Sequence, residues 1–350
     1  MKTVAFFNNK GGVGKTSMVY HLAWMFRDLG HHVLATDLDP QSNLTSIFLN
    51  EPDVESLWPE GQHPRTVLGA IDSLIQKLGD ISDCSTQSIA PRLSLIPGDL
   101  GLSTFEDRVS EAWSRCLDDN PANAHDAFRV ITAFYRIMKK AAESCGAEIV
   151  LIDVGPNIGA INRAALVAAD FVVIPLGADL FSLQGLRNLG PTLREWRKGW
   201  RNRLENGKPP SGLPLPSGQM LPLGYVLLNP SVRENRPVKS YLKWANRIPG
   251  VYSREVLNSK DTPAATAEID PNQLAMLKHF KSLMPMAQDA RKPMFHLTAA
   301  DGAIGGHAAA VLDCKDQFES LANRILRDIE AESSSSVSLP ESINPSTPAA

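Results

Sequence analysis

Short apolar runs alternate along this chain with longer segments that repeat an apolar residue every three or four positions. The runs at 3–8, 32–37, 93–97, 148–153, 171–175 and 223–228 have the composition of strands covered on both faces. The segments at 15–26, 66–78, 105–113, 128–144, 182–200 and 314–329 place apolar residues on one helical face. This alternation predicts an α/β fold, with a doubly wound, mostly parallel sheet and helices on both faces.

Stretches without either period separate these elements. Residues 51–65 are rich in Pro and Gly and read as a surface loop, and Ser103 or Thr104 could cap the helix that follows. We expect a single domain over residues 1–330, with insertions near 52–65, 118–125 and 198–218. The Ser/Pro/Ala segment 331–350 has too little apolar content to fold, so it is expected to be a disordered tail.

A glycine-rich loop joins the first predicted strand to the first predicted helix. Gly11, Gly12 and Gly14 follow the strand at once, and the helix begins at Lys15. Glycines let the backbone approach a polyphosphate, and a helix start adds free N–H groups and its positive dipole end. The segment therefore predicts a phosphate-binding loop, in which Lys15 reaches the terminal phosphates and the Thr16 hydroxyl binds Mg²⁺.

Carboxylates follow two other predicted strands. Asp37 ends the strand at 32–37 and Asp39 follows it, and Asp153 ends the strand at 148–153. In doubly wound sheets the carboxyl ends of the strands line the ligand crevice. Next to a phosphate loop, acids at these positions suit Mg²⁺ and an attacking water.

Three motifs together resemble the ParA/MinD family of deviant Walker P-loop ATPases: KGGVGKT at 10–16, DLDPQSNLT at 37–45 and EIVLID at 148–153. The standard phosphate-loop pattern has glycine where this chain has Asn9, and Lys10 is an additional lysine. The resemblance implies that Lys10 reaches the nucleotide of a partner subunit, that Asp39 orients the water and that Asn229 contacts adenine. The expected catalytic residues are Lys10, Lys15 and Asp39. The expected nucleotide-binding residues are Gly11, Gly12, Val13, Gly14, Lys15, Thr16, Ser17 and Asn229. The expected magnesium shell is Thr16, Asp37 and Asp153.

The family also implies a function as an ATP-dependent homodimer with slow hydrolysis that a partner stimulates. A ParA-like protein would bind DNA non-specifically and respond to a ParB-like protein. A MinD-like protein would carry a protein or membrane cargo and needs a basic terminal helix, whereas this last helix carries Asp328, Glu330 and Glu332. A metabolic ATP-dependent enzyme on the same scaffold is the third alternative. Because the last helix is acidic, we expect no stable membrane association.

Charge and cysteine content bear on two points, the possible DNA contact and the cellular compartment. The formal net charge of −3 gives no overall attraction to nucleic acid. The stretch 233–247, however, contains several basic residues and a single acidic one, Glu234. This run is either a solvated helix face or a DNA contact. The DNA candidates are Arg233, Arg236, Lys239 and Lys243. The four cysteines are widely spaced, which favours reduced thiols in a cytoplasmic protein, located on the nucleoid if it binds DNA.

Overall fold

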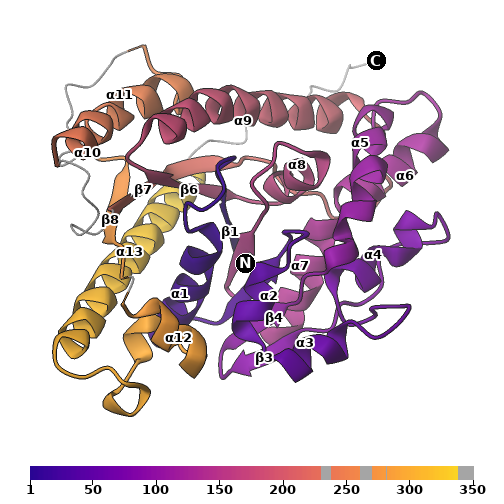
Figure 1. Cartoon of the computed structure of the whole chain (residues 1–350). Helices are drawn as coiled ribbons and strands as arrows, with labels where there is room; N and C mark the ends of the chain where they lie inside the picture. Colours follow the sequence, from indigo (N-terminus) through magenta and orange to yellow (C-terminus); the bar gives the residue numbers. More distant parts are fainter. Residues whose placement is uncertain (230–237, 261–269, 281, 338–350) are drawn as a thin grey trace.

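The computed structural model describes residues 1–229, 238–260, 270–280 and 282–337, with the side chains of 229, 238–240 and 335–337 outside this description. Within these residues eight strands form one sheet in the order β3-β4-β2-β5-β1-β6-β7-β8 (Figure 1). Only the β3–β4 pair among them is antiparallel. The strands are β1 Lys2–Phe6, β2 Val33–Asp37, β3 Gln87–Ala90, β4 Leu93–Ile96, β5 Ile149–Asp153, β6 Phe171–Gly177, β7 Leu221–Asn229 and β8 Gln273–Lys278.

Helices cover both faces of this sheet, as the sequence predicts. One face carries α1 Lys15–Asp28, α2 Asn43–Phe48, α3 Glu51–Leu57, α12 Met284–Ala290, the short turns η3 Met294–His296 and η4 Ala299–Asp301, and α13 Gly306–Val337. The other face carries α4 Val67–Ile75, η1 Leu100–Phe105, α5 Glu106–Arg115, α6 Pro121–Ile131, α7 Ala133–Cys145, α8 Ala160–Val167, α9 Leu180–Asn206, α10 Val238–Ala245, α11 Ile248–Val251 and the π-helical turn η2 Tyr252–Val256.

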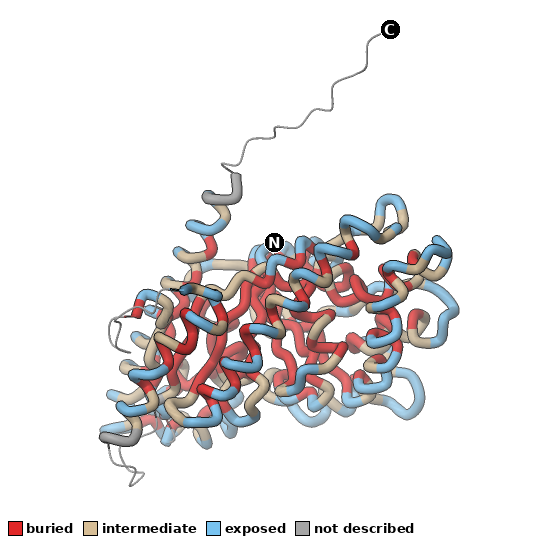
Figure 2. Tube along the Cα trace, turned by 90° about the horizontal axis from the view of Figure 1, so that it is seen from above, coloured by how far each residue is buried: buried red, intermediate tan, exposed pale blue. Residues whose placement is uncertain are grey.

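The strands separate two hydrophobic cores. In β1, Val4 and Phe6 pack on the side of α1, whereas Ala5 and the following residue Phe7 pack on the side of α9. All four side chains are fully buried, and Figure 2 shows the strands as the buried centre of the molecule. A strand that is apolar at every position is what a sheet covered on both faces requires.

Several boundaries differ from those expected, and each difference has a local cause. Residues 51–57 form α3 and not a loop, because Asn50 accepts a hydrogen bond from the Asp53 N–H at 2.8 Å and caps the helix start. Asn120 caps α6 in the same way through the Ala122 N–H at 3.0 Å. The helix expected at 128–144 is divided at Thr132 between α6 and α7.

Other expected segments are more helical than their composition indicates. Helix α9 continues through Pro191 as far as Asn206, into the insertion expected at 198–218. Helix α13 extends to Val337, so the first part of the expected disordered tail is helical, and residues 338–350 lie outside the described residues. Neither Ser103 nor Thr104 caps α5; Asp99 instead caps the preceding turn η1.

Candidate functional site

The expected phosphate-binding loop lies between β1 and α1, at the carboxyl edge of the sheet. Gly12 and Gly14 adopt left-handed backbone angles, with φ of 72° and 68°, and Gly14 is the N-cap residue of α1. Lys15 is buried, and its Nζ donates to the Asn8 carbonyl at 3.1 Å. Free N–H groups at a helix start and a lysine cation thus share one place, which is the arrangement that binds polyphosphate anions.

The strand-end carboxylates lie together beside this loop. Strands β2 and β5 are parallel neighbours, and their register pairs Asp37 with Asp153. Asp39 lies just beyond β2, also buried, and its N–H donates to Asp37 Oδ1 at 3.3 Å. The structure therefore brings together the three acids that the sequence placed at strand ends.

The carboxylates differ in the hydrogen bonds that they already accept. Asp37 Oδ2 accepts hydrogen bonds from the Thr45 N–H at 2.8 Å and from the Thr45 hydroxyl at 2.7 Å. Both oxygens of Asp153 are buried, and neither has a hydrogen bond of normal geometry among the described residues, although the Thr16 side chain lies near enough to favour the charged form. A buried carboxylate without partners is costly unless a cation or proton joins it. Asp153 is therefore the acid best suited to a metal, whereas Asp37 is already held by Thr45.

Burial sets the electrostatics of this edge. It raises the pKa of Asp37 to about 6, and burial followed by the nearby Asp37 charge raises the pKa of Asp153 well above its usual range. Burial lowers the pKa of Lys15, against the attraction of Asp153 and Asp39. Carboxylates that resist ionisation in this way would be stabilised by a bound cation.

These residues fit Mg²⁺ that arrives together with a nucleotide. Among the described residues, no group of three or more His, Cys, Asp or Glu side chains could hold a metal alone. Mg²⁺ usually takes one or two protein ligands together with phosphate and water oxygens. Thr16 and Asp153 would hold it here, and the ion would neutralise charge on the phosphates when bound.

A cavity of about 310 Å³ adjoins the phosphate loop. Its walls come from the loop at 12–14, from 177–179 after β6 and from 277–280 at the end of β8. Apolar side chains dominate the far wall, namely Leu228, Leu277, Phe280, Met294 and Phe318. Its position and lining suit a purine base. The sequence analysis missed the β8 wall, because that strand was not predicted.

The proposed base contact at Asn229 stays a prediction. Asn229 ends β7, beside Lys278 of β8 in the strand register. Its backbone thus reaches the correct edge of the sheet, while its side chain lies outside the described atoms.

The additional lysine of the loop is paired within its own chain. Lys10 Nζ lies 2.5 Å from Asp179 Oδ2, and 5.9 Å from the ring centroid of Phe181. Asp179 is the N-cap of α9, where its Oδ1 accepts from the Ser182 N–H at 2.9 Å. The sequence analysis missed Asp179, although its place directly after β6 follows the same strand-end rule as Asp153.

Most of the predicted DNA-binding residues cannot be placed. Arg233 and Arg236 lie outside the described residues, as does the side chain of Lys239. Lys243 is exposed, with its Nζ 5.3 Å from the ring centroid of Trp244, and the Arg247 guanidinium lies 5.2 Å from the same ring. A DNA contact at this run remains a prediction.

Comparison with known proteins identifies the family. A family model described as an AAA domain matches residues 1–206. IncC of Escherichia coli is 33% identical over 198 residues, which cover 57% of this chain and 47% of IncC. ParA of Caulobacter vibrioides is 29% identical over 59% of this chain and 67% of that protein. The chain belongs to the ParA/MinD family of P-loop ATPases. It spans about half the length of the first curated relatives it matches.

Solved structures with low sequence identity share the fold. The DIP2308 protein of Corynebacterium diphtheriae aligns with a TM-score of 0.68 at 22% identity, over 95% of this chain and all of that one. Apo McdA of Cyanothece aligns with a TM-score of 0.59 at 19% identity, over 93% of this chain and 99% of that one. Within the described part of this ParA/MinD-family chain, no helix is both long and apolar enough to cross a bilayer.

Proposed function

We propose that this ParA/MinD-family chain is a ParA-like ATPase that hydrolyses ATP slowly, as a nucleotide-dependent homodimer that positions a cargo. The observation that carries the proposal is the convergence of a phosphate loop with Asp39 and the buried Asp153 at one sheet edge. Lys15 and the loop N–H groups would bind the phosphates, and Asp39 would orient the attacking water. In-line phosphoryl transfer depends mainly on such positioning and charge neutralisation.

The finer parts of the proposal come from the family resemblance. Lys10 would leave Asp179 and contact the nucleotide of a second subunit, so that hydrolysis depends on dimerisation. The cargo would be DNA, bound without sequence preference through the basic run that contains Arg233 and Arg236. A ParB-like partner would stimulate hydrolysis and release the dimer. Relatives named for chromosome partitioning, such as ParA of Caulobacter vibrioides, support this choice of cargo.

Nucleotide binding is tested first with Lys15→Ala. This change removes the buried cation of the loop, and a hydrogen bond to a charged group contributes about 1.5–3 kcal/mol. We expect the Kd for ATP–Mg²⁺, measured by calorimetry, to rise roughly 10- to 100-fold. Lys140→Ala is the control, because Lys140 is an exposed lysine paired with Asp83 far from the loop. An unchanged Kd in Lys15→Ala would contradict the proposed nucleotide site.

DNA binding is tested with the double variant Arg233→Glu and Arg236→Glu. If the run contacts phosphates, the ATP-bound wild type binds duplex DNA at low salt with an affinity that falls steeply as salt rises. The variant should lose this binding while it still dimerises with ATP. The control replaces Arg187 and Arg201, two exposed arginines of α9, by Glu, so that its net charge changes by the same amount. Equal loss in both variants, or a wild-type dimer that ignores DNA, would point to a different cargo.

A further inference from the structure

Helix α8 begins without a cap from its own sequence. Its N-cap residue, Gly159, has no side chain, and its first turn contains no acidic residue. Glu106, the first residue of α5, takes this place instead. Its Oε1 accepts from the Ala160 N–H at 2.5 Å and its Oε2 from the Ile161 N–H at 2.9 Å. A carboxylate at a helix start is stabilised both by these charge-assisted bonds and by the helix dipole.

The fit between Glu106 and the helix start requires glycine at position 159. A Cβ at this position would lie 2.7 Å from Glu106 Oε1, closer than such atoms approach. The carboxylate therefore sits directly against the backbone of the segment that joins β5 to α8. This segment directly follows Asp153, so it begins at the cluster of carboxylates beside the phosphate loop.

The first turn of α8 in turn holds that segment. The buried Asn162 donates from Nδ2 to the Gly155 carbonyl at 2.8 Å and to the Asn157 carbonyl at 2.7 Å. Gly155 lies against Asp39, since a Cβ on Gly155 would be 3.2 Å from Asp39 Oδ1. Gly155 thus lies beside Asp39, and Asn162 ties residues 155–157 to the helix start that Glu106 caps.

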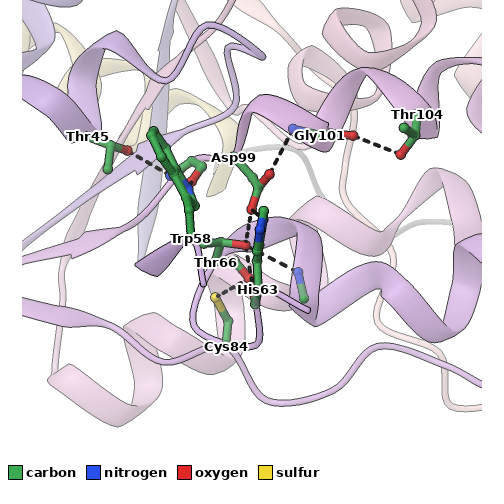
Figure 3. Close-up of polar contacts among 10 residues, drawn as sticks. Thr45, Trp58, His63, Thr66, Cys84, Asp99, Gly101 and Thr104 are labelled. Atoms are coloured by element: carbon green, nitrogen blue, oxygen red, sulfur yellow. Dashed lines mark hydrogen bonds and ion pairs between the residues drawn. The ribbon is translucent and has the colours of Figure 1, made fainter. Parts of the chain in front are cut away.

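A chain of hydrogen bonds connects the turn before Glu106 to Asp37 at the candidate site. Thr45 donates from its hydroxyl to Asp37 and accepts from the Gly98 N–H at 2.8 Å. The next residue, Asp99, is fully buried and caps η1 through the Gly101 N–H at 2.8 Å. Figure 3 shows the side chains of His63 and Thr66 together beside the Asp99 carboxylate: the Thr66 hydroxyl donates to its Oδ2 at 2.7 Å, and His63 Nδ1 lies 2.7 Å from the same oxygen. The turn η1 ends at Phe105, directly before Glu106.

We propose that Glu106 is a positioning residue for ATP hydrolysis: through α8 and Asn162 it holds the segment 155–157 so that Gly155 stays beside Asp39. The inference rests on the proposed function, because Asp39 is there the residue that orients the water. Glu106 makes its contacts with the α8 backbone and acts through Asn162. Its loss should lower kcat and leave ATP binding intact, because Lys15 and the phosphate loop lie on another segment of the chain.

The test uses Glu106→Gln in the full chain. Glutamine keeps the size of the side chain but turns an N–H₂ group toward one of the two backbone N–H groups. A small misplacement of a reacting group can cost about 100-fold in rate. We expect kcat to fall roughly 10- to 100-fold, while the Kd for ATP stays within about twofold of the wild-type value. Glu111→Gln is the control, on the same helix and in an exposed pair with Arg115.

A second measurement needs no nucleotide. Amide hydrogen exchange should become faster at residues 155–161 in Glu106→Gln but not in Glu111→Gln. Asn162→Ala keeps the cap and removes only the clamp on residues 155–157, so it should reproduce the fall in kcat. The double variant should be no slower than either single one, because both act through the same contact. Asn162→Ala also serves as the deciding variant if Glu106→Gln does not fold.

The outcomes separate this inference from the proposed function. Wild-type kcat in Glu106→Gln or in Asn162→Ala would overturn the positioning role alone. A fall in kcat accompanied by an equal loss of ATP affinity would also overturn it, since that pattern indicates general damage to the site. A wild-type chain that does not bind ATP would overturn the proposed function and, with it, this inference.

Discussion

At the scale of the single residue, Lys10 has two competing partners. In the structure it pairs with Asp179 of its own chain, whereas the proposed dimer needs it at the nucleotide of a second chain. Burial disfavours ionisation of Asp179, yet the hydrogen bond from Lys10 lowers the pKa of that carboxyl below its usual range. The intramolecular pair therefore opposes dimerisation by the free energy needed to break it.

Asp179→Asn should make the dimer form more readily. The substitution removes the charge but keeps an oxygen that can cap α9 through Ser182. Partly exposed ion pairs contribute about 0.2–1 kcal/mol, and the proposed dimer would break one pair in each subunit, so the dimer Kd in ATP should fall by roughly 2- to 30-fold. Sedimentation velocity over a concentration series measures this. Asp83→Asn, which breaks the exposed pair with Lys140, should leave the dimer Kd unchanged. A dimer Kd equal to wild type in Asp179→Asn would show that the pair does not compete.

Two buried groups give opposite pH dependence to the free energy of unfolding. The pKa of Asp37 is raised by burial to about 6, so the folded state binds more protons than the unfolded chain between about pH 4 and 6. Its stabilising effect is lost as pH rises through that range. The pKa of His21 is lowered by burial to about 4, so its contribution is lost as pH falls from about 6.5 to 4. Each shift corresponds to about 3 kcal/mol, and the two slopes oppose each other.

Single substitutions should separate these slopes. Without nucleotide or Mg²⁺, Asp37→Asn should make Tm rise more steeply between pH 4.5 and 6.5 than in wild type. His21→Gln should make Tm fall over the same interval, and the raised pKa of Asp153 acts in that same direction. Thermal denaturation followed by circular dichroism measures all three proteins. Parallel Tm profiles would show that neither group changes its protonation on unfolding.

At the scale of elements, helix α9 packs against the π-helical turn η2, and Gly190 lies at this contact. A Cβ at Gly190 would lie 1.9 Å from the Glu255 carbonyl oxygen, which belongs to the backbone and cannot rotate away. Alanine normally stabilises a helix interior by about 1 kcal/mol relative to glycine. Here the clash should outweigh that gain, since overpacking costs about 1–3 kcal/mol.

Gly190→Ala should therefore lower the midpoint of urea unfolding. Gly306→Ala is the matched control, because it also lies in a helix but a Cβ there meets no atom within 4 Å. The control should unfold at or slightly above the wild-type midpoint. Equal midpoints for Gly190→Ala and the wild type would mean that α9 can move away from η2 at little cost.

The elements that sequence patterns predict are those with a long apolar face. Strands β2 and β5 are buried at every position, and β1 at every position after Lys2, so their mainly apolar runs predicted the sheet and the edge where Asp37 meets Asp153. Helix α3 buries only Leu57, and its stability depends on the Asn50 cap, so it has no apolar period to find. Strand β3 is a short edge strand in which no residue is fully buried.

The same limit applies within the site. Lys15, Thr16 and Asp153 were predictable because each follows a strand by a fixed local rule. Glu106 and Asn162 act through backbone groups that only the folded chain brings near, and Glu106 lies more than fifty residues from the helix it caps. Contacts of this kind leave no short-range pattern in the sequence, because their spacing is set by the packing of α5 against α8.

At the scale of the whole molecule, the first and last described helices share one core. Met18, Leu22 and Phe26 of α1 belong to the same cluster as Phe318 and Leu321 of α13. The ring of His21 stacks on Phe318 with centroids 5.0 Å apart. Figure 1 shows α1 and α13 on the same side of the sheet. Phe318 also lines the cavity beside the phosphate loop, so that site includes both ends of the described chain.

This pairing of α1 with α13 sets a waiting time during synthesis. A ribosome adds about 5–20 residues per second, and about 280 residues separate the end of α1 from the start of α13. The helix that bears the phosphate loop thus remains without its packing partner for roughly 14 to 56 seconds after it is made. During that interval the part of its apolar surface that α13 later covers is exposed to chaperones and to neighbouring nascent chains. A newborn copy gains the wall that Phe318 gives to the cavity beside the phosphate loop only when translation has passed through α13. If the proposed function is right, half-made chains would therefore take no part in the ATP cycle of finished ones.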